Sequence, residues 1–248
     1  MIKLKKYLYI RNYVYKIKWL RIFNNIANSQ TGNQFRIHSS SAVKSSIIGN
    51  NVTVNKHVTI LNSEVSNYCR LLSNNYIYKT NIGDYSYVNN NSTILRAKIG
   101  KFCSIASHVY IGPGSHPLDC ITTHPFIFLT DHGKIISENN VGIVKKREKQ
   151  SIIIGNDVWI GQGALIMNDI NIGDGAIIGA RTVVTKNVDP YSIIIGTPGK
   201  LYKYRYSKKI ISELLKIKWW NWPRAKLIEN VDKFYFPENF ISEFSDSK

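Results

Sequence analysis

Acidic residues are scarce in this chain. Its 248 residues include 16 Asp and Glu against 33 Lys and Arg, which gives a formal net charge of +17. No acid precedes Glu64, whereas the same stretch holds ten Lys and Arg. This imbalance favours an anionic partner, such as nucleic acid, an acidic membrane surface or a phosphorylated ligand. Nucleic-acid binding explains only the charge, and we expect no nucleic-acid partner.

Cysteine is also rare, and histidine lacks the spacing of a metal site. The three cysteines Cys69, Cys103 and Cys120 are odd in number and form no CxxC pair, which argues against a disulfide framework and favours the cytoplasm. The six histidines show no ladder that would bring three ligands together, as a zinc hydratase of a repeat fold needs. We therefore expect no metal.

Residues 1–23 lack an uninterrupted apolar run. Arg11, Lys16 and Lys18 break each candidate run, and no small-residue cleavage site follows, so the segment predicts neither a signal peptide nor a membrane span. Its basic and aromatic residues fit a surface helix bound peripherally to an anionic membrane. The plainer alternative is a basic arm packed on the body. We expect a cytoplasmic protein and leave its association with the inner face of the membrane open.

What the chain has instead is a six-residue repeat. From Ile154 it divides as IGNDVW, IGQGAL, IMNDIN, IGDGAI, IGARTV and VTKNVD. A similar run begins at Ile82, with the block ILRAK one residue short, and a fainter one begins at Ile48. An inward aliphatic residue followed by a turn residue makes each block a short strand and a bend. Three blocks make a triangular coil, and stacked coils share one core. A β-sandwich or β-propeller has no reason for this period.

The repeat predicts an all-β solenoid with three parts. These are a basic N-terminal arm over residues 1–35, a repeat coil over 36–198 interrupted by a loop over 117–150, and a helical extension over 199–248. In the extension, an apolar stripe follows Ser207, which is a plausible helix cap, so residues 207–220 are predicted to form a helix.

The repeat resembles that of the hexapeptide-repeat acyltransferases. The segment IKWWNWP at 217–223 is similar to one found in their xenobiotic acetyltransferase branch, which includes the type B chloramphenicol and streptogramin acetyltransferases. The resemblance implies a left-handed parallel β-helix, although crossover rules alone would have favoured a right-handed one. It also implies a homotrimer with active sites between neighbouring subunits.

The repeat breaks at GPGSHPLDC, residues 112–120. The loop that follows is too apolar for a disordered linker, and a loop on a rigid coil is a natural wall for a binding cleft. In the resembled family the catalytic base is a histidine at the start of such a loop, and the matching residue is His116. An imidazole can take a proton from an attacking hydroxyl and return it to a leaving thiolate. The resemblance also places Asp119 and His124 near the acceptor, against an alternative of loop capping for Asp119.

The same resemblance implies acetyl-CoA as the acyl donor. The donor's long pantetheine arm needs an extended groove, and its phosphates need lysines or backbone amides. Matching motif to motif along the coil and its closing segment gives a set of donor-binding positions: Gln162, Ala180, Thr185, Lys186, Lys200 and Lys203. For each lysine the alternative is an ordinary solvated charge.

These features predict an acetyl-CoA-dependent O-acetyltransferase acting on a sugar hydroxyl of a bacterial surface polysaccharide, such as capsule or O-antigen. The loop departs from the antibiotic branch, with Ser before His116 and Pro after it, and a cationic surface suits anionic glycans. Alternatives are N-acetylation of an amino sugar on a nucleotide carrier, O-acetylation of an antibiotic, and an inert scaffold. A scaffold gives no reason for a long apolar loop after a histidine.

Overall fold

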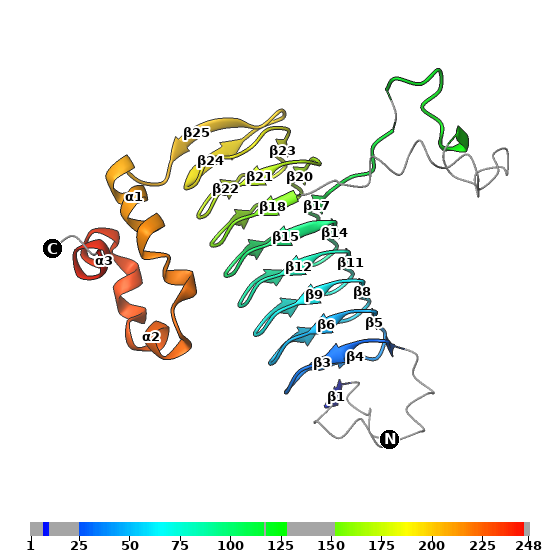
Figure 1. Ribbon diagram of the computed structural model, residues 1–248, viewed down its shortest axis with the longest axis horizontal. Coiled ribbons are helices and arrows are strands. Elements are labelled where there is room, and N and C mark those ends of the chain that lie inside the picture. The colour runs from blue at the N-terminus through cyan, green and yellow to red at the C-terminus, as the bar shows by residue number, and fades with distance from the viewer. Residues whose placement is uncertain (1–6, 10–24, 117, 128–151, 246–248) are drawn as a thin grey trace, which may run out of the picture.

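The structure is a computed structural model that describes residues 7–9, 25–116, 118–127 and 152–245. It confirms the predicted fold, a left-handed parallel β-helix with a C-terminal helical extension. Figure 1 shows the coils stacked along one axis, with the extension along one side and the loop after β17 (Tyr110–Ile111) projecting from the other. Within the predicted arm, residues 1–23 lie outside the described residues except for 7–9, which pair antiparallel with residues 36–38. Most of the predicted loop and the last three residues also lie outside them.

Three sheets form the sides of the triangular coil. Sheet A contains β1 (Tyr7–Tyr9), β4 (Arg36–His38), β7 (Thr53–Val54), β10 (Arg70–Leu71), β13 (Tyr87–Val88), β16 (Ser104–Ile105), β19 (Trp159–Ile160), β22 (Ile177–Ile178), β24 (Ser192–Ile195) and β25 (Lys200–Tyr204). Sheet B contains β2 (Ile26–Ala27), β5 (Ala42–Lys44), β8 (Thr59–Leu61), β11 (Tyr76–Tyr78), β14 (Thr93–Leu95), β17, β20 (Leu165–Ile166) and β23 (Val183–Val184). Sheet C contains β3 (Gln30–Thr31), β6 (Ile47–Ile48), β9 (Glu64–Val65), β12 (Asn81–Ile82), β15 (Ala97–Ile99), β18 (Ile152–Ile154) and β21 (Asn171–Ile172).

The chain runs from sheet C to sheet A to sheet B in each coil, so the bends are named the C–A, A–B and B–C corners. In the N-terminal coils equivalent residues are 17 apart, as in the bonds from the Val58 N–H to Ser41 Oγ and from the Cys103 N–H to Ser86 Oγ. Directly beyond the loop the spacing is 18, as between Asn156 and Asp174, and in the last coil it falls to 16, as between Ile177 and Ile193. The B–C corner of the earlier coils is one residue tighter, which explains why the six-residue repeat is faint there.

The core is a single column of aliphatic side chains inside the triangle. Ile60, Ile77, Ile94 and Ile111 are fully buried and lie on successive strands of sheet B. Parallel registers place like residues above one another, so each coil buries its neighbour's apolar surface. No coil could bury this surface alone.

The sheets begin before residue 36, where the repeat predicted the coil to start. Ile26 of β2 pairs in parallel with Val43, and Gln30 of β3 pairs with Ile47. This first coil has no block that opens with Ile-Gly, so the repeat did not reveal it.

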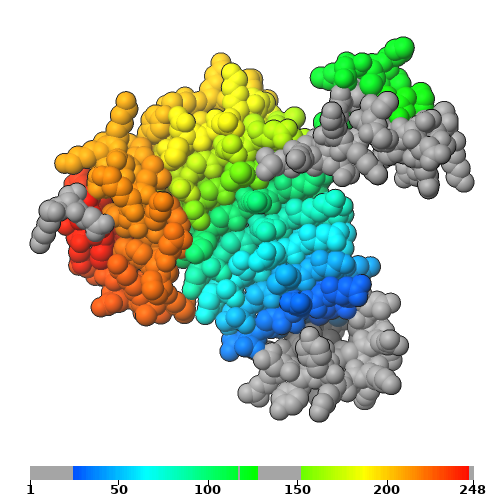
Figure 2. Space-filling model, in the orientation of Figure 1, coloured from blue at the N-terminus to red at the C-terminus, as the bar shows by residue number. Residues whose placement is uncertain are grey.

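The extension follows a β24–β25 hairpin that ends sheet A. Its helices are α1 (Lys208–Ile217), η6 (Trp219–Asn221), α2 (Arg224–Glu229), η7 (Val231–Tyr235) and α3 (Pro237–Phe244). The predicted helix is confirmed at its start, because α1 begins after Ser207, whose side chain accepts a bond from the Ile210 N–H. It ends at Ile217, three residues earlier than predicted, because Lys218 adopts a left-handed conformation. Figure 2 shows the extension packed against the side of the coil.

A stack of aromatic rings joins the extension to the C–A corner. The ring centroids of Tyr68 and Tyr85 are 4.8 Å apart, those of Tyr85 and Phe102 are 4.7 Å apart, and Trp219 of η6 lies 4.9 Å from Phe102. The Arg224 guanidinium lies 5.1 Å from the Tyr68 ring. Stacked rings and a cation over a ring are favourable contacts, so the extension is held across several coils.

An ion pair anchors the extension further along the same corner. Arg205 Nη1 lies 3.0 Å from the Asp157 carboxylate and donates to the Gly175 carbonyl at 2.7 Å, while the guanidinium packs over the Tyr191 ring. Gly175 has a φ of +68°, and a Cβ there would lie 2.4 Å from the Tyr191 ring. Burial raises the pKa of Asp157, and Arg205 opposes that rise. Because of this conformation and this close contact, only glycine at position 175 lets the Tyr191 ring pack beside the ion pair.

Candidate functional site

The loop leaves the coil at the B–C corner through Gly112 and Pro113. Gly112 has a φ of +78°, and a Cβ there would lie 2.4 Å from the Leu95 carbonyl oxygen, so only glycine fits. Arg96 Nη2 donates to the Gly112 carbonyl at 3.2 Å, and Asn168 Nδ2 donates to the Pro113 carbonyl at 2.6 Å. Side chains from the coils on either side thus fix where the loop begins.

His116 lies four residues after this anchor, with an exposed side chain. Its Nδ1 is 2.7 Å from the Thr123 carbonyl oxygen, on the returning part of the loop. A carbonyl oxygen can only accept a hydrogen bond, so Nδ1 carries the proton of the neutral ring, and Nε2 carries the lone pair. The loop backbone therefore selects the tautomer in which Nε2 can act as a base.

His124 has the opposite arrangement. Its Nδ1 accepts a bond from the Phe126 N–H at 3.2 Å, at the start of η3 (Pro125–Ile127). In the neutral ring the proton is then on Nε2, which can donate a hydrogen bond but cannot remove a proton. Asp119 is exposed on the same loop. In their neutral forms the two histidines thus hold opposite tautomers, with the proton on Nδ1 of His116 and on Nε2 of His124.

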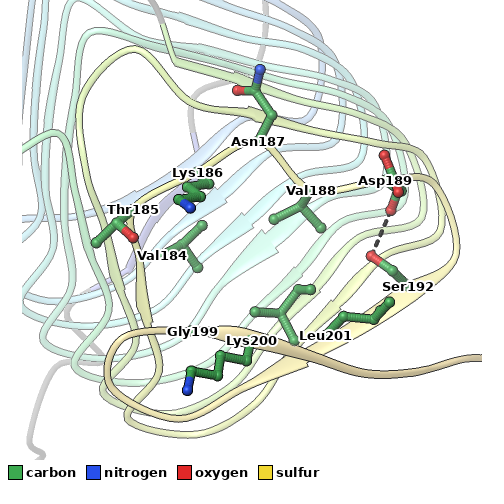
Figure 3. Close-up of a pocket in the computed structure, with 11 residues that line it drawn as sticks. Val184, Thr185, Lys186, Asn187, Val188, Asp189, Ser192, Gly199, Lys200 and Leu201 are labelled. Carbon is green, nitrogen blue, oxygen red and sulfur yellow. Dashed lines mark hydrogen bonds between the residues drawn. The ribbon is translucent and has the colours of Figure 1, made fainter.

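Five of the six predicted donor residues fall into two groups. Thr185, Lys186 and Lys200 line one pocket of about 300 Å³ at the C-terminal end of the coil, together with Asn187, Asp189 and Ser192 (Figure 3). Gln162 and Ala180 lie instead on the A–B corner of successive coils and are exposed. Lys203 is on β25, opposite Ile193, with its Nζ 5.7 Å from the Tyr202 ring.

One chain does not bring the two ends of the predicted site together. The loop that carries His116 leaves the coil at the B–C corner, whereas Gln162 and Ala180 lie at the A–B corner, on the other edge of sheet B. Figure 2 shows residues 118–127 standing away from the body of the coil. The arrangement therefore contains an exposed histidine and two candidate donor surfaces, which are separated within a single chain.

Sequence reasoning missed Arg96 and Asn168, which anchor the loop. The signal for Arg96 was the short block ILRAK, where the missing residue marks the tight B–C corner. The signal for Asn168 was the block IMNDIN, in which Met167 stands where most blocks have Gly and Asn168 follows it. Asn168 Oδ1 is buried with no hydrogen-bond partner among the described residues.

The described residues contain neither a cluster of metal ligands nor a membrane-spanning helix. No three His, Cys, Asp or Glu side chains there are grouped as metal ligands would be. In the same part of the chain, no helix combines the length and apolar character needed to cross a membrane.

Comparison with known proteins supports the resemblance. Residues 151–186 match the family described as bacterial transferase hexapeptide (six repeats). A probable macrolide acetyltransferase of Lysinibacillus sphaericus is 44% identical over 119 residues, which are 48% of this chain and 64% of that protein. A chloramphenicol acetyltransferase of Agrobacterium fabrum is 36% identical over 116 residues, 47% of this chain and 54% of that protein.

A third relative carries a different description. A putative lipopolysaccharide biosynthesis O-acetyl transferase of Escherichia coli K12 is 26% identical over 93 residues, which are 34% of this chain and 47% of that protein. The three matches thus span between 47% and 64% of the relatives' lengths. The resemblance inferred from the sequence is confirmed: the chain carries the bacterial transferase hexapeptide repeat and is similar, over about half its length, to acetyltransferases of that kind.

Proposed function

We propose that this protein is an acetyl-CoA-dependent O-acetyltransferase with His116 as its general base. The observation that carries the proposal is the bond between His116 Nδ1 and the Thr123 carbonyl. A hydroxyl acceptor is almost never ionised at neutral pH, so its attack on a thioester needs a base. An imidazole whose tautomer is set by a backbone carbonyl is such a base.

In the proposed reaction Nε2 of His116 takes the proton of the acceptor hydroxyl as its oxygen attacks the thioester carbonyl carbon. The tetrahedral intermediate then collapses, the carbon–sulfur bond breaks, and the imidazolium returns its proton to the thiolate. The products are the acetyl ester and CoA with a free thiol. Asp119 and His124, on the same loop, are proposed to orient the acceptor, with His124 donating from Nε2.

The pocket at the end of the coil is proposed to hold one portion of the donor. Lys186 and Lys200 contribute two cations to it, and ammonium groups bind phosphates well. A volume of about 300 Å³ is at the low end for ligand pockets. The pocket therefore fits the phosphate end of acetyl-CoA, while Gln162 and Ala180 are proposed to contact the pantetheine arm.

A homotrimer would unite the separated parts. In it, one subunit's His116 loop would lie against the A–B corner of its neighbour. Sheet B suits such a contact, because one of its two outward rows contains no charged side chain, and the other has Lys44 near its N-terminal end. The uncharged row consists of Ala42, Thr59, Tyr76, Thr93, Tyr110, Leu165 and Val183. Interface cores are depleted in charge and rich in aromatic residues.

For the acceptor we propose a hydroxyl of a bacterial surface polysaccharide. The net charge of +17 suits an anionic glycan, and one relative is described as acting in lipopolysaccharide biosynthesis. An antibiotic is the second candidate, favoured by the macrolide and chloramphenicol acetyltransferases at 44% and 36% identity. About half of this chain lies outside those matches. An amino-sugar acceptor would depend less on His116, because a deprotonated amine needs less help from a base.

The test is release of the CoA thiol from acetyl-CoA in the presence of surface polysaccharides, chloramphenicol and a macrolide. We expect thiol release with a polysaccharide. His116→Ala should lower turnover by about 10²- to 10⁴-fold without changing acetyl-CoA affinity. Lys98→Ala is the control, because Lys98 is exposed on sheet C and belongs to neither the loop nor the donor surfaces. Near-wild-type turnover by His116→Ala would contradict the mechanism and favour an amine acceptor.

A further inference from the structure

The outer face of sheet A carries a row of side chains that the proposed reaction does not use. The register places Arg70, Tyr87, Ser104 and Trp159 side by side on successive strands. Arg70 is exposed, and Tyr87 and Trp159 are 40% and 53% exposed. Strands are about 4.8 Å apart, so the two aromatic rings are two steps, about 10 Å, apart. Large aromatic side chains left in solvent at regular spacing indicate a binding surface.

The adjoining A–B corner adds cations and amides. Lys56 and Arg181 are exposed there. Between them runs a ladder in which Asn74 Nδ2 donates to Asn91 Oδ1 at 3.0 Å and Asn91 Nδ2 lies 3.4 Å from His108 Nε2. These groups can donate to and accept from sugar hydroxyls.

This surface also lacks acids. Among the described residues, no Asp or Glu lies on the strands of sheet A or on the A–B corner. Sheet C and the C–A corner differ, because Glu64 lies on sheet C, and Asp84, Asp157 and Asp174 lie on the C–A corner. The described strands of sheet B also lack acids, but Lys44 is the one base on them. Within the described part of the chain, sheet A and the A–B corner therefore combine several basic residues with no acid, which favours an anionic ligand there.

We propose that sheet A and the A–B corner form a binding track for an anionic polysaccharide. The apolar faces of sugar rings would stack on Tyr87 and Trp159, while Arg70 and Lys56 would pair with the acidic groups of the chain. The track rests on the proposed function and narrows its acceptor to a polymer. It runs along the coil axis toward Gln162, three residues after Trp159, so the polymer would approach the proposed donor surface.

A polysaccharide suits this surface better than the two other candidates. A second copy of the chain would find a better partner in the uncharged row of sheet B. A single-stranded nucleic acid would also stack on aromatic rings and pair with cations. The amide ladder, which offers donors and acceptors at each step, favours a chain rich in hydroxyl groups.

The experiment measures binding of three probes to the full-length protein: polygalacturonate, a linear polymer of uronic acid; dextran, a neutral glucan; and a single-stranded DNA oligonucleotide. The variants are Arg70→Ala and Trp159→Ala. Lys98→Ala and Ile153→Ala are matched controls, because both residues are exposed on sheet C. Circular dichroism and light scattering check that every variant keeps its fold and assembly.

We expect wild type to bind polygalacturonate and not dextran, with an affinity that falls as salt rises. Arg70→Ala and Trp159→Ala should each weaken binding by about tenfold, which corresponds to about 1.4 kcal/mol. The two sheet C variants should stay close to wild type. If Arg70→Ala and Lys98→Ala weakened binding equally, binding would depend only on net charge, and the proposed track would be wrong. Unchanged binding of polygalacturonate by Trp159→Ala would also overturn the track. Tighter binding of the DNA than of polygalacturonate would overturn it in favour of nucleic acid.

Failure of the track and failure of the proposed function can be told apart in the wild-type protein. If no acceptor releases the CoA thiol, the proposed function fails whatever the binding results. If a small acceptor releases it but the sheet A variants bind polygalacturonate normally, only the track fails.

Discussion

Replacing Arg205 should destabilise the C-terminal extension far more than replacing its partner Asp157. Arg205→Met leaves the Asp157 carboxylate near Asp174, in a site where burial already raises its pKa. It also leaves the Gly175 carbonyl without the 2.7 Å bond. Asp157→Asn, in contrast, leaves Arg205 bonded to that carbonyl and packed over Tyr191. Removing one member of a buried pair strands the other, and the cost depends on which one is stranded.

The magnitude follows from the exposure of the pair. Breaking a fully buried pair costs about 3–5 kcal/mol, but the side chains of Arg205 and Asp157 keep 23% and 29% exposure, so solvent screens part of this loss. We expect Arg205→Met to lower the free energy of unfolding by about 2 kcal/mol. Asp157→Asn should lower it by about 1 kcal/mol or less, the worth of an ordinary hydrogen bond.

The difference between the variants should depend on pH. A carboxyl whose folded pKa is raised contributes stability below its unfolded pKa and loses that contribution as pH rises through the folded pKa. Arg205 lowers the pKa of Asp157, so Arg205→Met raises that pKa further. The deficit of Arg205→Met should therefore be largest near neutral pH and shrink as the solution is acidified and Asp157 takes up a proton. Asp157→Asn cannot show this recovery.

The assay is urea unfolding at one protein concentration, at about pH 7 and about pH 5. Fluorescence reports on the extension, because Trp219, Trp220 and Trp222 lie within or beside η6. Equal losses for the two variants, or a deficit of Arg205→Met that grows on acidification, would refute this account of the pair.

Three further predictions concern the thiols, the assembly and the N-terminal arm. Burial raises the pKa of Cys69 and Cys103 to about 12, whereas Cys120 is exposed. A thiol reagent should therefore modify one cysteine per chain in the native protein and three after unfolding. Modification of all three in the native protein would contradict this packing. Light scattering should give about three times the 28.3 kDa chain mass, and a monomer would remove the inter-subunit site. Deleting residues 1–23 should abolish salt-sensitive binding to anionic vesicles while keeping thiol release; aggregation of the shortened protein would instead make that segment part of the packed body.

The repeat predicted the fold because the same aliphatic residues produce both the sequence pattern and the buried core. An aliphatic residue at every sixth position is both a visible pattern and a buried column. The pattern failed where strands form without the repeated residues. Residues 26–31 form strands without an Ile-Gly block, so the first coil was missed. Contacts between distant segments, such as Arg205 with Asp157, leave no periodic trace and could not be predicted.

The candidate site was only partly visible in the sequence. The break in the repeat and the resemblance both indicated His116, but its tautomer depends on the Thr123 carbonyl, and a backbone contact cannot be read from residue types. The donor residues were predicted as one set, yet they occupy two surfaces. Matching motifs gives the order of these residues along the chain but not which corner of the triangle each one occupies. The row on sheet A was hidden for another reason: its members are 17 residues apart before the loop, out of step with the six-residue blocks.

Because the strands of neighbouring coils before the loop pair residues that are 17 positions apart, the length of the protein can change in whole units. Excising 17 consecutive residues from that region would bring the flanking coils into the same register, with aliphatic residues again above aliphatic residues. Excising 16 or 18 would shift the register by one residue and turn inward side chains outward, unless a corner took up the difference as the B–C corner does in the 18-residue coil beyond the loop. Evolution could therefore lengthen or shorten this coil by duplicating or losing one unit at a time. Each unit would move the N-terminal end by about 4.8 Å relative to the loop and leave the surroundings of His116 unchanged.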